Sequence, residues 1–173
     1  AAAARQRGAN VTVIEPSSQP LLHVVGEQIG ATFAALHRDH GVDLRLGIGV
    51  TGFAGDGTVS SVHVKGHASV PADMVLIAVG AAPNIALADV AGLELANGGI
   101  AVDATLRSSD PDIYAAGDVA AHDHPKYPQR VRVEHWANAQ DQGKHVAANL
   151  LGAEEPYVLR PFFFSDQYDL GCE

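Results

Sequence analysis

The chain has 173 residues, of which 47% are hydrophobic, so it is large and apolar enough to bury a core in one domain or two small ones. Its formal net charge of -9 argues against nucleic acid or an anionic membrane surface as a partner, because phosphate binding needs clustered cations. No apolar run approaches the ~20 residues of a membrane span, and the opening residues lack the regions of a signal peptide, so we expect a soluble, cytoplasmic protein.

The first fifty residues alternate between helical and strand patterns. An Ala-rich helix over residues 1–7 precedes a short β-branched strand over Val11–Glu15, which we expect to be buried. Apolar residues at helical spacing predict a helix over Val25–His40, and a second strand follows over Val42–Val50. This order of elements is half of a doubly wound α/β unit.

The middle of the chain departs from this pattern before returning to it. Asp56-Gly57 is a hairpin-turn dipeptide between alternating residues, which predicts an antiparallel meander over residues 51–70. The apolar run Asp73–Gly80 predicts a buried strand, and Ile113–Ala116 predicts another. A polar loop over His122–Arg130 and a helix over Glu134–Leu151 follow.

Glu15 closes the first strand, where dinucleotide-binding folds place an acid that accepts hydrogen bonds from the adenosine ribose. A solvated charge is the alternative interpretation. The phosphate-binding glycine loop lies ~20 residues before such an acid, so we expect it to precede residue 1. Because Pro16–Ser18 offers no cation for a 2'-phosphate, the site favours NADH over NADPH.

Two segments follow predicted strands at the edge of the sheet where ligands bind in α/β folds. In the first, Val79–Ala81, Gly80 would allow a ring or ribose to approach the backbone, although an ordinary turn explains these residues equally well. In the second, Gly117 leaves room for a ligand, and the Asp118 carboxylate suits a chain of sugar-like hydroxyls. A turn or capping aspartate is the alternative there.

Three segments resemble those of a known family. Tyr114–Val119, with Thr105 and Pro111 before it, resembles the second FAD-binding motif of the two-dinucleotide-fold flavoprotein reductases. Glu134–Ala139 and Pro161–Tyr168 narrow the resemblance to the ferredoxin or rubredoxin reductases that supply oxygenases, with apoptosis-inducing-factor-like proteins as relatives. The resemblance covers essentially the whole chain.

The resemblance implies an NAD(P)H-dependent FAD oxidoreductase that passes electrons from NADH through FAD to a ferredoxin-type iron-sulfur protein. It places Asp118 at the ribityl and pyrophosphate portion of FAD, the start of the second long helix at the pyrimidine edge, and the aromatic run over the isoalloxazine. Relatives often have Trp at the positions of Phe162 and Phe164. The implied cofactor residues are Gly117, Asp118, Val119, Glu134, His135, Trp136 and Phe164 for FAD, and Glu15, Val79, Gly80 and Ala81 for NAD.

The expected fold class is α/β, with partial Rossmann-like, doubly wound NAD- and FAD-binding folds in three layers and an inserted antiparallel meander. Residues 1–82 would be the later part of the NAD(P)H-binding domain, and residues 83–155 the second segment of the FAD-binding domain. Residues 156–173 would begin an α+β C-terminal interface domain. Hydride transfer between nicotinamide and flavin needs no general acid or base, so no catalytic side chain is assigned.

Several alternatives remain at this point. The chain could instead be part of an apoptosis-inducing-factor-like or NADH-oxidase-like flavoprotein, or a fragment that does not hold FAD alone. The pair His122 and His124 has no further ligand spaced to complete a metal site, so no metal is assigned. Five of the eleven cations fall within residues 126–160, which would suit an acidic ferredoxin or would be an ordinary mixed surface.

Overall fold

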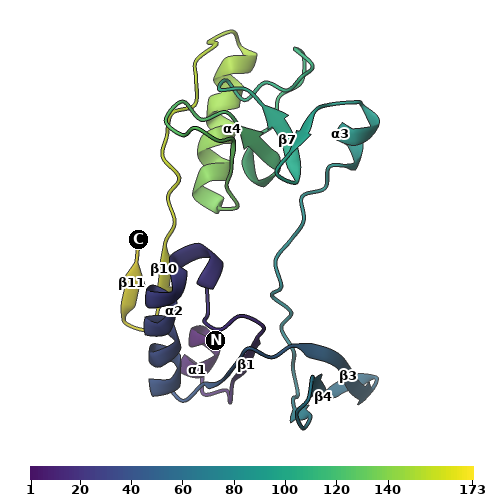
Figure 1. Cartoon of the computed structure of the whole chain (residues 1–173), viewed down its shortest axis with the longest axis vertical. Coiled ribbons are helices and arrows are strands. Elements are labelled where there is room, and N and C mark those ends of the chain that lie inside the picture. The colour runs from purple at the N-terminus through teal and green to yellow at the C-terminus, as the bar shows by residue number, and fades with distance from the viewer. The chain divides into compact units, whose positions relative to one another are not determined.

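The computed structural model describes residues 1–173, which form two compact units (Figure 1). Unit 1 consists of Ala1–Ala78 and Asp166–Gly171, and unit 2 consists of Val79–Ser165 and Cys172–Glu173. No helix is both long enough and apolar enough to cross a membrane. The sheets of the chain contain both parallel and antiparallel strand pairs, and the expected α/β fold class is confirmed.

Unit 1 opens with the predicted order of helix, strand, helix and strand. These are α1 (Ala2–Gln6), β1 (Thr12–Glu15), α2 (Leu22–Asp39) and β2 (Asp43–Leu46). The strands β1 and β2 pair in parallel, and the middle of α2 provides the best-buried apolar residues of the unit, Phe33 and Ala34. The sequence predicts that β1 is buried, but the strand is only half-buried, because β2 is its only neighbour in the sheet.

Glycines set the boundaries of two elements that the sequence predicts less accurately. Helix α2 begins at Leu22, but Gly26 has a non-helical backbone (φ 78°, ψ 179°), so the regular helix starts close to the predicted Val25. The predicted strand Val42–Val50 is two strands, because Gly47 adopts a left-handed φ of 70° after β2 ends.

The antiparallel meander is confirmed. It contains β3 (Val50–Asp56), β4 (Thr58–Val64) and β5 (Val70–Pro71), in the order β3-β4-β5. Asp56 pairs with Thr58 around Gly57, as the hairpin dipeptide predicts.

The predicted buried strand Asp73–Gly80 is wrong: these residues form no strand. Most of their apolar side chains are exposed, with Met74, Leu76 and Val79 between 85% and 88% accessible. The apolar run has the composition of a strand, but no sheet of the structure places a partner strand beside it. A strand needs the backbone hydrogen bonds of a neighbour, and no local pattern supplies them.

Unit 2 is a four-stranded sheet with one long helix. Its strands are β6 (Leu95–Ala96), β7 (Gly99–Val102), β8 (Ala120–His122) and β9 (Val131–Arg132), in that order, with β7 and β8 parallel. The helices are α3 (Ala86–Val90), the short 3-10 turn η1 (Gly117–Val119) and α4 (Trp136–Leu150). The core consists of Val102, Leu106, Ala115, Ala120 and Tyr157.

Two further predictions concern unit 2. The helix predicted over Glu134–Leu151 is confirmed as α4, which begins two residues later because His135 is its N-cap. The strand predicted over Ile113–Ala116 is wrong, since only an isolated bridge joins Tyr114 to Arg107. The aromatic tail ends in two short paired strands, β10 (Ser165–Gln167) and β11 (Leu170–Cys172), joined by a turn in which Tyr168 stacks on His40, the C-cap residue of α2.

Candidate functional site

The predicted flavin motif forms a tight turn against helix α4. Gly117 has a left-handed φ of 78°, and a Cβ atom at this position would lie 3.3 Å from the Cβ atom of Ala139. Its N–H donates to the Oε1 atom of the buried Gln142 at 2.8 Å. Glycine therefore lets the turn approach α4 closely, and Gln142 fixes the turn to the helix.

The side chain of Asp118 is available to a ligand. Asp118 is exposed, and its carboxylate makes no hydrogen bond or ion pair within the chain. Only its backbone carbonyl is engaged, as an acceptor from Arg132 at 2.9 Å. The structure thus holds the backbone of this residue while leaving an ionised acceptor free, which suits recognition of hydroxyl groups.

The start of α4 lies beside the aromatic run. His135 is the N-cap, and its Nδ1 atom accepts from the Ala137 N–H at 3.2 Å. The His135 ring packs edge-on against Phe164, with the ring centroids 5.3 Å apart. Trp136 is 68% exposed in the first turn, where a helix offers free N–H groups and a partial positive charge. The structure therefore brings Phe164 and His135 together at a helix N-terminus.

Arg132 joins the two parts of this site, and the sequence analysis did not assign it there. Its Nη1 atom donates to the Asp118 carbonyl at 2.9 Å and to Oε1 of Glu134 at 2.7 Å. Its Nε atom donates to the Asn97 carbonyl at 2.7 Å. An internal anchor of this kind has no local sequence pattern, because its partners lie on separate segments.

The cation-rich stretch is therefore less available for docking than its composition indicates. Arg132 is committed to the contacts above, and Arg130 donates to the carbonyls of Val102 and Ala121 and pairs with Asp123. Their side chains are only 19% and 27% exposed. Two of the five cations of residues 126–160 thus stabilise the fold, and the interpretation as a docking patch loses part of its support.

The predicted NAD residues lie in different units. Glu15 is half-buried in unit 1, and its Oε1 atom accepts from the Ser17 N–H at 2.8 Å. Its second carboxylate oxygen makes no hydrogen bond within the chain. Val79–Ala81 is an exposed segment assigned to unit 2, and Gly80 has a left-handed φ of 87°. These three residues do not follow a strand, contrary to the reason for which the sequence selected them.

Gln142 connects the flavin motif to a buried histidine. Because the Gly117 N–H must face the amide oxygen, the Gln142 NH2 group faces the Nδ1 atom of His122, at 3.4 Å. Nδ1 is then an acceptor, and the proton of the neutral ring is on Nε2. His122 is 1% exposed, and its Nε2 atom makes no hydrogen bond of good geometry.

The neighbouring His124 is engaged with the backbone. Its Nε2 atom lies 3.0 Å from the Leu159 carbonyl, and its Nδ1 atom accepts from the Lys126 N–H at 3.0 Å. Both ring nitrogens are therefore used in fixing the surrounding loops. This arrangement agrees with a structural role for the His122 and His124 pair.

We expect stability to fall as the pH drops below about 6.5, the ordinary pKa of histidine. Burial lowers the pKa of His122, and the nearby charge of His124 lowers it further. The Val131 backbone and the Asp123 carboxylate raise this pKa and oppose the shift. The unfolded chain then binds a proton that the folded chain does not, so acid favours unfolding. Urea unfolding of the His122→Asn variant between pH 7 and 5 should show a weaker acid dependence than the parent. The exposed His63→Asn variant is the control, and equal slopes in all three proteins would contradict the expectation.

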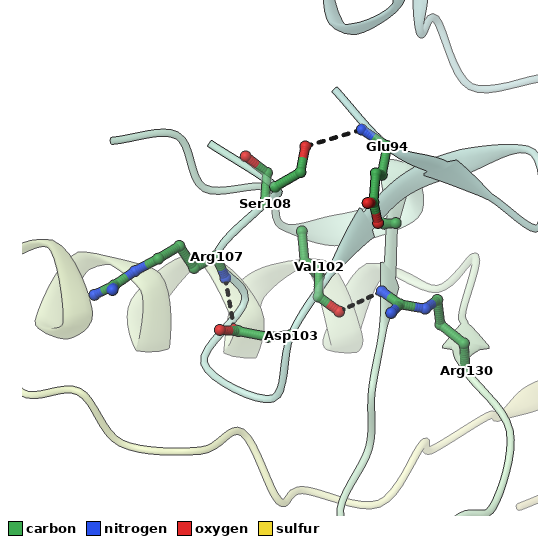
Figure 2. A pocket seen from close by; sticks show the side chains of 8 residues that line it. Glu94, Val102, Asp103, Arg107, Ser108 and Arg130 are labelled. Atoms are coloured by element: carbon green, nitrogen blue, oxygen red, sulfur yellow. Dashed lines mark hydrogen bonds between the residues drawn. The ribbon is translucent and has the colours of Figure 1, made fainter. Parts of the chain in front are cut away.

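One shallow pocket lies in unit 2, and none of the predicted site residues lines it (Figure 2). Its polar groups bond one another: Arg130 donates to the Val102 carbonyl, and the Arg107 N–H donates to Asp103. Its volume of about 140 Å³ is below the roughly 300–1,000 Å³ of small-molecule sites. The pocket is lined by Glu94, Ala101, Val102, Asp103, Arg107, Ser108, Ser109 and Arg130. It is too small for a dinucleotide cofactor.

Comparison with known proteins gives a consistent assignment. The sequence model of the family described as "Pyridine nucleotide-disulphide oxidoreductase" matches residues 1–143. The chain is 41% identical to the anthranilate 1,2-dioxygenase system ferredoxin--NAD(+) reductase component of Burkholderia cepacia, over 100% of this chain and 42% of that protein. It is 40% identical to rhodocoxin reductase of Rhodococcus erythropolis, over 98% of this chain and 40% of that protein.

Two solved structures of reductases also match the chain. The ferredoxin reductase for the CYP199A2 system from Rhodopseudomonas palustris matches with a TM-score of 0.90 and 38% identity, over 97% of this chain and 42% of that one. The covalent putidaredoxin reductase-putidaredoxin complex matches with a TM-score of 0.90 and 34% identity, over 98% of this chain and 41% of that one. The chain thus spans about two fifths of the length of these four relatives.

Proposed function

Because the chain belongs to the pyridine nucleotide-disulphide oxidoreductase family, we propose that it is part of an FAD-dependent ferredoxin reductase. The protein would pass electrons from NADH through FAD to a ferredoxin-type iron-sulfur protein. One observation carries the proposal: the glycine turn at Gly117 packs on α4 and leaves the Asp118 carboxylate exposed. Relatives named ferredoxin--NAD(+) reductase components support the choice of substrates.

The residues of unit 2 fit one side of a flavin site. FAD, when bound, accepts a hydride from a nicotinamide and releases electrons one at a time. Gly117 and Val119 would let the cofactor approach the backbone, while Asp118 would accept hydrogen bonds from its hydroxyl groups. The N-terminus of α4, with Glu134, His135 and Trp136, would present N–H groups to a negatively charged edge. Phe164 would cover an aromatic face.

The residues assigned to NAD would contact the ribose and the backbone-facing part of the nucleotide. Glu15 keeps one carboxylate oxygen free to accept from a ribose hydroxyl, because only Oε1 is bonded to the Ser17 N–H. Pro16–Ser18 supplies no cation, which supports NADH over NADPH. Val79–Ala81 would line the nucleotide as an exposed segment, with Gly80 allowing a ring or ribose to approach the backbone. No side chain is proposed as a general acid or base.

The proposed domains follow the predicted boundaries. Residues 1–82 would belong to the NAD(P)H-binding domain and residues 83–155 to the FAD-binding domain. Residues 156–173 would begin the C-terminal domain. The flavin residues up to Trp136 fall in the second of these segments, and Phe164 falls in the third, where it packs on His135.

We expect the Asp118→Asn variant of the protein, at its natural length, to bind FAD about 10–100-fold more weakly, since a hydrogen bond to a charged group contributes ~1.5–3 kcal/mol. The recovery of flavin fluorescence on dilution would give the dissociation constants. Asp112→Asn is the matched control, because Asp112 is also exposed and its carboxylate makes no hydrogen bond within the chain. Equal affinities of the two variants would refute the role of Asp118.

The choice of electron acceptor is tested separately. NADH oxidation by the FAD-loaded protein should accelerate on addition of a [2Fe–2S] ferredoxin and should transfer electrons onward to cytochrome c. Activity with oxygen alone, unchanged by any ferredoxin, would contradict the ferredoxin reductase and favour an oxidase. A parallel comparison of NADH with NADPH would test the preference for NADH that the lack of a cation in Pro16–Ser18 supports.

A further inference from the structure

Arg132 on strand β9 binds three segments that are far apart in the sequence. Its guanidinium donates to the carbonyls of Asn97 and Asp118 and to the carboxylate of Glu134, at 2.7, 2.9 and 2.7 Å. The side chain is only 19% exposed. It therefore joins the turn before β7, the flavin motif and the residues that lead into α4.

The packing around Gly99 leaves room for this arrangement. A Cβ atom on Gly99 would lie 2.8 Å from the Cδ atom of Arg132 and 2.3 Å from the carbonyl oxygen of Val119. Any side chain at this position would displace the arginine stem, the flavin motif or both. The strand β7 thus accommodates Arg132 directly next to the motif.

The geometry points to Arg132 as a positioning residue for the flavin site, an inference that rests on the proposed function. By holding the Asp118 backbone and Glu134 with one nitrogen, Arg132 fixes the distance between the Asp118 carboxylate and the N-terminus of α4. The cofactor would contact both of these groups. The Nε and Nη1 atoms of Arg132 are committed to these protein groups, and through them Arg132 acts on its neighbours.

The arrangement requires arginine and not a positive charge alone. The Nε and Nη1 atoms of the planar guanidinium bond in different directions, to Asn97 and to the Asp118–Glu134 pair. Lysine has a single nitrogen on a flexible stem and cannot reproduce this fixed fork. An Arg132→Lys variant therefore keeps the charge and loses the geometry.

Arg130 provides a matched control on the same segment. It also donates to two backbone carbonyls, those of Val102 and Ala121, and pairs with the Asp123 carboxylate. Its side chain is 27% exposed. None of its partners belongs to the flavin motif or to α4, so its removal should cost similar stability without a direct effect on FAD.

The experiment compares Arg132→Gln, Arg132→Lys and Arg130→Gln in the protein at its natural length. The FAD dissociation constant is measured by flavin fluorescence, the flavin absorption spectrum is recorded, and unfolding of the FAD-free protein is followed in urea. We expect Arg132→Gln to bind FAD about tenfold more weakly than Arg130→Gln, the effect of losing one charge-assisted hydrogen bond. The two glutamine variants should have similar unfolding midpoints, and Arg132→Lys should lie between wild type and Arg132→Gln in affinity.

The possible outcomes separate the two proposals. In one outcome, FAD affinity falls only in proportion to the loss of stability, and to the same extent in the Arg130 and Arg132 variants. This result would overturn the positioning role of Arg132 and leave the proposed function intact. A wild-type protein that retains no FAD would overturn the proposed function and this inference with it. If Arg132→Gln does not fold, Arg132→Lys decides: an affinity equal to that of wild type would also overturn the inference.

Discussion

Replacing Leu106 with alanine is expected to lower the free energy of unfolding of unit 2 by about 2–5 kcal/mol. Leu106 is 0% exposed and packs at the centre of a core formed by Val102, Ala115, Ala120 and Tyr157. Its truncation removes buried apolar surface and leaves a cavity that the short strands around it can close only in part. The residue also has a left-handed φ of 69°, and alanine does not relieve this strain.

The matched control is Leu151→Ala, the same change at a side chain that is 90% exposed. It should alter the free energy of unfolding by less than about 0.5 kcal/mol. Because the chain has two compact units, amide hydrogen exchange should accompany denaturant unfolding, with the Ala115 N–H, which donates to the Leu106 carbonyl at 3.1 Å, as the reporter. Similar losses in the two variants would show that Leu106 is not a core residue.

The elements that the sequence predicts well are those whose signals are local. The end of helix α4 follows from Gly152, the glycine directly after its C-cap, and the β3–β4 hairpin follows from Asp56-Gly57. In each case, the residues that form the element also carry the pattern. Sequence reasoning therefore identifies the element to within two or three residues.

Strands are predicted less well because their partners lie elsewhere in the chain. The run Asp73–Gly80 is apolar and β-branched, yet no strand of unit 1 pairs with it. Ile113–Ala116 likewise forms only a single bridge. Composition indicates which residues could form a strand, whereas hydrogen bonding with a neighbour decides whether they do.

In the candidate site too, features with a local sequence signal are predicted, and features that depend on distant partners are not. The motif around Gly117 and Asp118 is contiguous, so the sequence indicates it. Gln142 and Arg132, which hold the motif in place, bond to backbone groups 25 and 14 residues away. For Gln142 a signal exists: the polar residues Asn138, Gln142 and Asn149 fall on one buried face of α4, where apolar residues are the rule.

Gly99→Ala is expected to lower the free energy of unfolding of unit 2 by about 1–3 kcal/mol or more. The new Cβ atom would lie 2.3 Å from the carbonyl oxygen of Val119, and a backbone atom cannot rotate away as a side chain can. Either β7 or the Gly117–Val119 turn must shift. The parallel pairing of Ile100 with Ala120, directly after this contact, should weaken with it.

The control for this change is Gly143→Ala, which tests the same substitution where space is available. Gly143 lies within α4, and a Cβ atom there would meet no atom within 4 Å. Alanine should stabilise the helix by about 0.5–1 kcal/mol, so the two variants should change the unfolding midpoint in opposite directions. FAD affinity should fall with Gly99→Ala alone, because only that change displaces the backbone beside Asp118. A Gly99→Ala variant as stable as wild type would mean that β7 and the flavin motif are not packed as closely as the structure places them.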